Sequence, residues 1–103
     1  MATDPTIERI EKEIQSHKVV IFVKGTPEAP QCGFSASTMD LFKKLKTPFH
    51  SVNILDHQDI RFKLPGYSQW PTFPQVFING KLVGGCDLVQ EMHRSGELEK
   101  LLK

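Results

Sequence analysis

One cysteine in a loop rich in glycine and proline is the residue of this sequence best placed to do chemistry. The segment from Lys24 to Ser35 reads Lys-Gly-Thr-Pro-Glu-Ala-Pro-Gln-Cys-Gly-Phe-Ser, so the cysteine is Cys32. A redox pair of the Cys-x-x-Cys type would have its second thiol three residues later, but the chain has Ser35 there. Because serine forms no disulfide, Cys32 must find a second sulfur on another molecule.

The surroundings of Cys32 favour its thiolate form. Apolar residues after it recur at helical spacing and predict a helix from Gly33 to about Leu45. Cys32 would then lie at a helix N-terminus, where a partial positive charge and free N–H groups lower the pKa of a thiol. Lys24, in the loop before it, would act in the same direction. The alternative is a small buried cysteine, but the glycine and proline residues of the loop favour an accessible one.

Length and composition predict one domain covering residues 1–103 in a reducing compartment. The chain has 13 basic and 12 acidic residues, a net charge of +1, which gives no electrostatic reason to expect nucleic acid or a membrane surface as partner. Two cysteines are too few for a secreted disulfide framework. We see no signal peptide or spanning segment, and a cleaved presequence would already be missing from this chain. The mitochondrial matrix and the cytoplasm are the expected locations.

The first half of the chain predicts alternating helices and strands. Asp4-Pro5 is typical of a helix start, and isoleucines at 7, 10 and 14 continue that helix. The run 19–23 is continuously apolar and predicts a central strand, and Phe49 to Asn53 alternates as a second strand. A short helix over Ile60 to Leu64 should be stopped by Pro65-Gly66.

The second half predicts a hairpin and a closing helix. Asn79-Gly80 lies between the apolar runs 75–78 and 81–83, and this dipeptide favours a type I′ turn. Apolar residues from Leu88 to Leu102 supply one helix or a pair of short ones. The order α-β-α-β-α-β-β-α predicts an α/β, thioredoxin-like fold, in which helices flank a small mixed four-stranded sheet.

Four motifs in order resemble a monothiol glutaredoxin of the Cys-Gly-Phe-Ser class, and the resemblance covers nearly the whole chain. The motifs are Lys24-Gly25-Thr26-Pro27, Cys32-Gly33-Phe34-Ser35, Trp70-Pro71-Thr72-Phe73-Pro74-Gln75 and Gly84-Gly85-Cys86-Asp87. Each alone is weak, but together they are specific. The chain departs from the family pattern at Leu64-Pro65-Gly66, which leaves the reach of Arg61 open.

The resemblance implies a glutathione site around Cys32. Its segment Thr72-Phe73-Pro74 would present backbone to the peptide part of glutathione, with Pro74 in the cis form; from the residues alone a trans proline is expected. Cys86 and Asp87, at a helix N-terminus, would hold the γ-glutamyl end, although Asp87 can also cap that helix.

At the other end of the tripeptide, the resemblance implies that Arg61 and Lys24 bind the glycyl carboxylate. On the residues alone, Arg61 reads as a solvated helix charge. Another low-molecular-weight thiol could take the place of glutathione in the same site.

The resemblance also implies a [2Fe–2S] cluster shared by a homodimer. All-thiolate ligation needs four sulfurs, and one chain has only two cysteines. In the family solution each chain supplies Cys32 and each bound glutathione supplies its thiol. A rival count uses Cys32 and Cys86 from both chains; Cys86 could instead pair with Cys32 on oxidation, or lie inert in the core.

Three functions remain open at this point. The first is a cluster carrier that passes the cluster to iron–sulfur acceptor or regulatory proteins. The second is a weak oxidoreductase acting on glutathione mixed disulfides through Cys32. The third is an interaction module. The four histidines are scattered without metal spacing and read as surface or satisfied positions, and Tyr67 and Trp70 read as packing or groove-wall residues.

Overall fold

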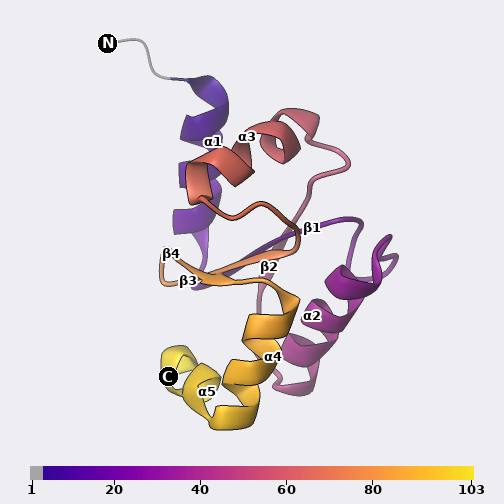
Figure 1. Cartoon of the computed structure of the whole chain (residues 1–103), viewed down its shortest axis with the longest axis vertical. Helices are drawn as coiled ribbons and strands as arrows, with labels where there is room; N and C mark the ends of the chain where they lie inside the picture. Colours follow the sequence, from indigo (N-terminus) through magenta and orange to yellow (C-terminus); the bar gives the residue numbers. More distant parts are fainter. Residues whose placement is uncertain (1–3) are drawn as a thin grey trace.

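The computed structural model describes residues 4–103 and has the predicted α/β architecture (Figure 1). The elements are α1 Pro5–Ser16, β1 Val19–Val23, α2 Gly33–Lys44, β2 His50–Asn53, α3 Gln58–Ser68, β3 Gln75–Ile78, β4 Lys81–Gly84, α4 Cys86–Ser95 and α5 Glu97–Leu102. The closing segment is therefore a pair of helices. No helix among the described residues is long and apolar enough to cross a membrane.

The four strands form one mixed sheet in the order β2-β1-β3-β4. The strands β1 and β2 run parallel, with α2 as the crossover between them, whereas β3 is antiparallel to both β1 and β4. All five residues of β1 are buried, as expected for a central strand covered on both faces. The predicted thioredoxin-like arrangement is confirmed.

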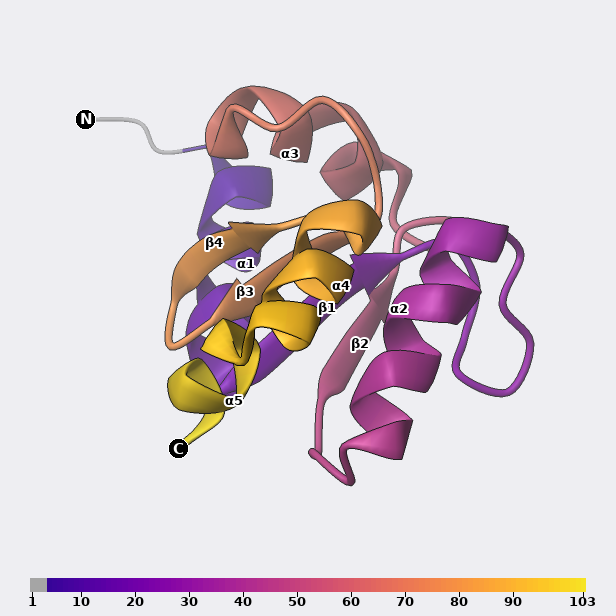
Figure 2. The ribbon, with the colours of Figure 1, turned by 60° about the horizontal axis from the view of Figure 1, so that its bottom comes forward.

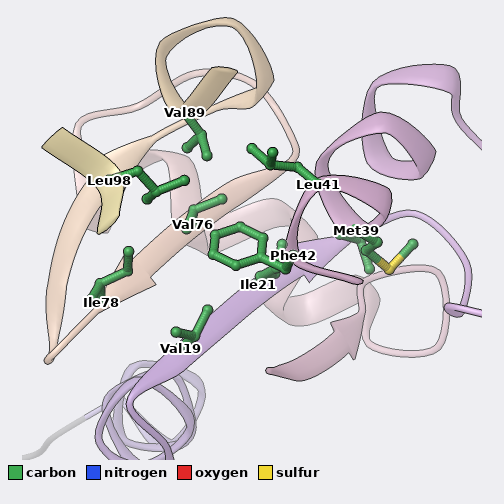
Figure 3. Packing of buried hydrophobic residues seen from close by; sticks show 10 residues of the cluster. Val19, Ile21, Met39, Leu41, Phe42, Val76, Ile78, Val89 and Leu98 are labelled. Carbon is green, nitrogen blue, oxygen red and sulfur yellow. The ribbon is translucent and has the colours of Figure 1, made fainter. Parts of the chain in front are cut away.

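Two apolar clusters hold the helices on the two faces of the sheet. Alternate residues of β1 point in opposite directions. Val20 and Phe22 pack with residues of α1 and α3, while Ile21 faces α2, α4 and α5. Figure 2 shows α2 and α4 on the same side of the sheet. Figure 3 shows how Phe42 of α2 meets Ile21 and Val76 of the sheet, with Val89 and Leu98 beside them.

The local signals read from the sequence form as predicted. The Asp4 carboxylate accepts a hydrogen bond of 2.9 Å from the backbone N–H of Thr6 and so caps α1. At the hairpin turn, Asn79 and Gly80 have φ of 54° and 80°, the positive values that a type I′ turn requires.

The helix α3 is longer than predicted, because it continues through Pro65 to Ser68. A proline inside a helix costs about 3 kcal/mol relative to alanine. The end of the helix is held on both sides of Pro65. Leu64 before it is fully buried, and the Pro65 carbonyl accepts the N–H groups of Gln69 and Trp70 after it. The prediction that Pro65-Gly66 stops the helix is wrong, and Arg61 lies well inside α3.

Candidate functional site

A tightly folded loop joins β1 to the cysteine motif. The backbone N–H of Gln31 bonds to the Lys24 carbonyl at 2.9 Å, and the N–H of Gly25 bonds to Oδ1 of Asn53 at 2.9 Å. Gly25 has φ of +100°, and a Cβ there would lie 2.6 Å from the Ala29 carbonyl oxygen. Glycine is therefore required at this position, and the loop holds Cys32 at the end of the central strand.

Cys32 is the N-cap residue of α2, as predicted, and its thiol is partly exposed. The backbone N–H of Ser35 is the main cause of a lowered pKa for Cys32; burial opposes it. The N–H of Phe34, the hydroxyl of Ser35 and the charge of Lys24 lower the pKa further. The thiolate is thus stabilised mainly by the first turn of the helix, and Lys24 contributes least.

Ser35 has a structural task that the sequence reasoning missed. Its side chain is fully buried, and its Oγ accepts the backbone N–H of Lys24 at 3.1 Å. Since a hydroxyl has one proton to donate, the same oxygen can turn that proton toward the sulfur of Cys32. Ser35 therefore links the end of β1 to the reactive thiol. A serine at the first helical turn was the available signal.

A groove of about 880 Å³ brings the predicted site residues together. It is lined by Cys32 and by each of the other candidates, namely Lys24, Arg61, Thr72, Phe73, Pro74, Cys86 and Asp87. The bond between Phe73 and Pro74 is cis, as the family resemblance implied. Thr72 is exposed, Phe73 half-buried and Pro74 buried.

Three charged residues of the groove form no ion pair among residues 4–103: Lys24, Arg61 and Asp87. The neighbours of Arg61 on α3 behave differently, since Asp59 pairs with Arg9 at 2.7 Å and Lys63 pairs with Asp4. Two cations and one carboxylate are thus left to face the groove. Such a set suits a small ligand that carries charges of both signs.

Two helix N-termini also open onto the groove without a side-chain cap. The neutral Cys32 thiol accepts no capping hydrogen bond, and only its thiolate form is stabilised by the N–H groups of Phe34 and Ser35. The N-cap of α4 is Gly85, which has no side chain. Cys86 and Asp87 are the first residues of α4, and free N–H groups in a first turn bind anions. The start of α4 therefore has free N–H groups at the place where the resemblance implied an anion site, and the site itself stays a prediction.

Phe34 and Leu88 form exposed apolar rims of the groove. Phe34 is 60% exposed and Leu88 is 41% exposed. Both lie in the first turns of their helices, Phe34 in α2 and Leu88 in α4.

The structure offers no protein-only metal site within residues 4–103, where no group of three or more His, Cys, Asp or Glu side chains is arranged around one point. His17 stacks on His50, whose Nε2 lies 2.6 Å from a Glu13 carboxylate oxygen, and His93 lies 2.5 Å from Glu99. His57 is exposed. A metal ion bound at Cys32 would need ligands from outside the chain.

The lowered pKa of Cys32 predicts a shifted pH profile for its alkylation. Iodoacetamide should react with Cys32 at lower pH than with a free cysteine, because the thiolate is the reactive form. The same shift stabilises the fold above the ordinary thiol pKa, and this contribution is lost as pH falls through the lowered value. Mass spectrometry of the Cys86→Ser variant from pH 4 to 9 measures the alkylation of Cys32. An alkylation midpoint at or above the pH found for free cysteine would contradict the lowered pKa.

Comparison with known proteins identifies the family. The glutaredoxin family model matches residues 19–83. Glutaredoxin 4 of Pasteurella multocida is 48% identical over 94% of this chain and 89% of its own. A probable monothiol glutaredoxin 2 of Rickettsia felis is 48% identical over 100% of this chain and 99% of its own.

The fold comparison agrees. A buckwheat glutaredoxin crystallised as a complex with glutathione superposes with a TM-score of 0.84 at 30% identity, covering 94% of this chain and 86% of the other. The family model matches this chain, the relatives named above align over most of its length, and Ser35 stands three residues after Cys32 at the start of α2. The chain therefore belongs to the glutaredoxin family and to its monothiol Cys-Gly-Phe-Ser class.

Proposed function

We propose that this protein binds glutathione in the groove and carries a [2Fe–2S] cluster between two of its copies. The observation that carries the proposal is one activated thiol, Cys32, in a groove whose charged residues Lys24, Arg61 and Asp87 form no ion pair among residues 4–103. The groove provides recognition, and the thiol provides one ligand.

Glutathione matches the groove in charge. It has a carboxylate at each end and an ammonium group at the γ-glutamyl end. Lys24 and Arg61 would bind the glycyl carboxylate, Asp87 would face the ammonium, and the N–H groups at the start of α4 would bind the other carboxylate. Phe73 would offer backbone to the peptide, between Thr72 and Pro74. The complex of the buckwheat relative with glutathione supports this ligand.

The number of sulfurs then predicts the assembly. Four thiolates are needed, and Cys32 together with one glutathione supplies two per copy, so two copies complete the set. Cys86 is left out of the ligand set in this count. The cluster is cargo, held for transfer to iron–sulfur acceptor or regulatory proteins in a reducing compartment, the mitochondrial matrix or the cytoplasm.

Anaerobic reconstitution tests the proposal. Protein mixed with iron, sulfide and glutathione is expected to become coloured, to hold about two irons per two chains and to sediment as a dimer. Iron analysis, visible absorption and analytical ultracentrifugation measure these quantities on one sample. A colourless, iron-free monomer under these conditions would exclude the carrier function.

A second candidate function, glutathione-dependent disulfide reduction, is favoured by the lowered pKa of Cys32. The Cys32 thiolate would attack the glutathione sulfur of a mixed disulfide, releasing the other thiolate and forming Cys32–S–SG. A second glutathione thiolate would then attack that bond, giving glutathione disulfide and restoring Cys32. Since Ser35 cannot resolve the intermediate, we expect slow turnover. A glutathione-coupled rate equal to that of a dithiol glutaredoxin would reverse the ranking.

A further inference from the structure

A buried amide lies directly behind the groove. Gln75, the first residue of β3, has 0% exposure. Its neighbour two residues on, Phe77, packs in the cluster with α1 and α3, so alternation along the strand sends the Gln75 side chain to that same face. There its Nε2 donates a hydrogen bond of 2.8 Å to the carbonyl of Trp70. Strand β3 is thereby bonded to the segment 70–74, which lines one side of the groove and is called the groove wall below.

Trp70 connects this bond to the other sides of the groove. Its backbone N–H bonds to the Pro65 carbonyl at 3.2 Å, at the end of α3. Its indole lies against Gly85, the N-cap of α4, because a Cβ on Gly85 would be 3.4 Å from Nε1 of Trp70. The Pro74 carbonyl oxygen is also close, at 3.2 Å from the same Cβ position. One residue thus spans α3, the wall 70–74 and the start of α4.

Stability alone gives little reason for a glutamine at this position. Oε1 of Gln75 and Nε1 of Trp70 are both buried, and neither has a hydrogen-bond partner among residues 4–103. A buried polar atom without a partner opposes folding, and an apolar side chain of similar length would avoid that cost. What the amide provides is a directional bond to Trp70.

We propose that Gln75 is a positioning residue for glutathione: through Trp70, its buried amide fixes the groove wall against the start of α4. This inference rests on the proposed glutathione site. It predicts that removing the amide lowers the affinity for glutathione by more than the accompanying loss of thermal stability would explain.

The measured quantity is the equilibrium between Cys32 and glutathione disulfide, which gives Cys32–S–SG and one reduced glutathione. Mass spectrometry of the Cys86→Ser background at fixed glutathione ratios provides it. Gln75→Met is expected to lower this equilibrium constant about tenfold, since the Trp70 carbonyl loses its donor. The matched control is Phe77→Leu, on the same face of β3, which should reduce thermal stability but stay within about twofold of the parent constant.

Gln75→Glu supplies a second, pH-dependent readout. A protonated glutamic acid can donate to the Trp70 carbonyl, whereas an ionised one cannot, and burial raises the pKa of such a carboxyl. The defect relative to the parent at the same pH is therefore expected to be larger at pH 8 than at pH 6, while that of Gln75→Met stays constant.

Two results would overturn the positioning role. If the parent forms the mixed disulfide and both Gln75 variants match Phe77→Leu at pH 6 and pH 8, Gln75 contributes only to the fold. If the parent itself forms no mixed disulfide, the glutathione site fails, and the role of Gln75 fails with it.

Discussion

Replacing Cys32 by serine is expected to abolish both glutathionylation at the groove and iron retention. Cys32 is the one thiol held at the start of α2 with a lowered pKa, and the hydroxyl that replaces it is neither a thiolate ligand nor a partner for a disulfide. Iron content and visible absorption after anaerobic reconstitution measure the loss, which should be complete. The fold should survive, because the thiol is partly exposed at the surface of the groove.

Cys86→Ser is the matched control for this variant. Cys86 lines the same groove but lies at the start of α4, and the sulfur count of the proposed cluster does not include it. Serine keeps the backbone N–H at the start of α4 that would bind glutathione, so the variant should keep its colour and iron. Equal loss of iron in both variants would favour the rival ligand set, in which both cysteines of each chain bind the cluster.

Ser35→Ala is expected to raise the pKa of Cys32 and to destabilise the protein. The change removes the hydroxyl that helps to lower that pKa, and it leaves the Lys24 N–H without its acceptor. The hydroxyl lowers the pKa of Cys32 less than the backbone N–H groups of Ser35 and Phe34 do, so alkylation of Cys32 near pH 6 should slow several-fold. The unpaired backbone donor should cost about 1–3 kcal/mol in free energy of unfolding.

Ser37→Ala, on the same helix, is the control for Ser35→Ala. Ser37 is exposed, so its loss should leave both the alkylation rate and the urea midpoint nearly unchanged. If Ser35→Ala and Ser37→Ala have the same alkylation rate and the same urea midpoint, the hydroxyl of Ser35 neither lowers the pKa of Cys32 nor stabilises the fold.

The parts of the fold that the sequence predicted correctly depend on local chemistry. A carboxylate before a proline starts α1, a continuous apolar run makes the buried strand β1, and Asn79-Gly80 closes the hairpin. In each case neighbours in the sequence decide the conformation. The position of Cys32 at a helix N-terminus was predictable for the same reason.

The parts that were missed depend on contacts between distant residues. Pro65 remains inside α3 because the buried Leu64 and the capped turn after it hold the helix. Ser35 bonds to Lys24 and Gln75 bonds to Trp70. The position of Ser35 in the first helical turn hints at a bonding role, but neither partner follows from residue type or spacing. Only the family resemblance predicted that Arg61 and Asp87 line one groove. From the residues alone, Arg61 is expected to be a solvated charge and Asp87 a helix cap.

The central claim is that glutathione, held by the groove, supplies the sulfurs that the chain lacks. Anaerobic reconstitution in parallel with glutathione and with an equal concentration of 2-mercaptoethanol tests it most directly, because the second thiol has no charges for Lys24, Arg61 and Asp87 to bind. We predict colour and about one iron per chain with glutathione, and neither with 2-mercaptoethanol. Equal iron with both thiols, or none with glutathione, would contradict the claim.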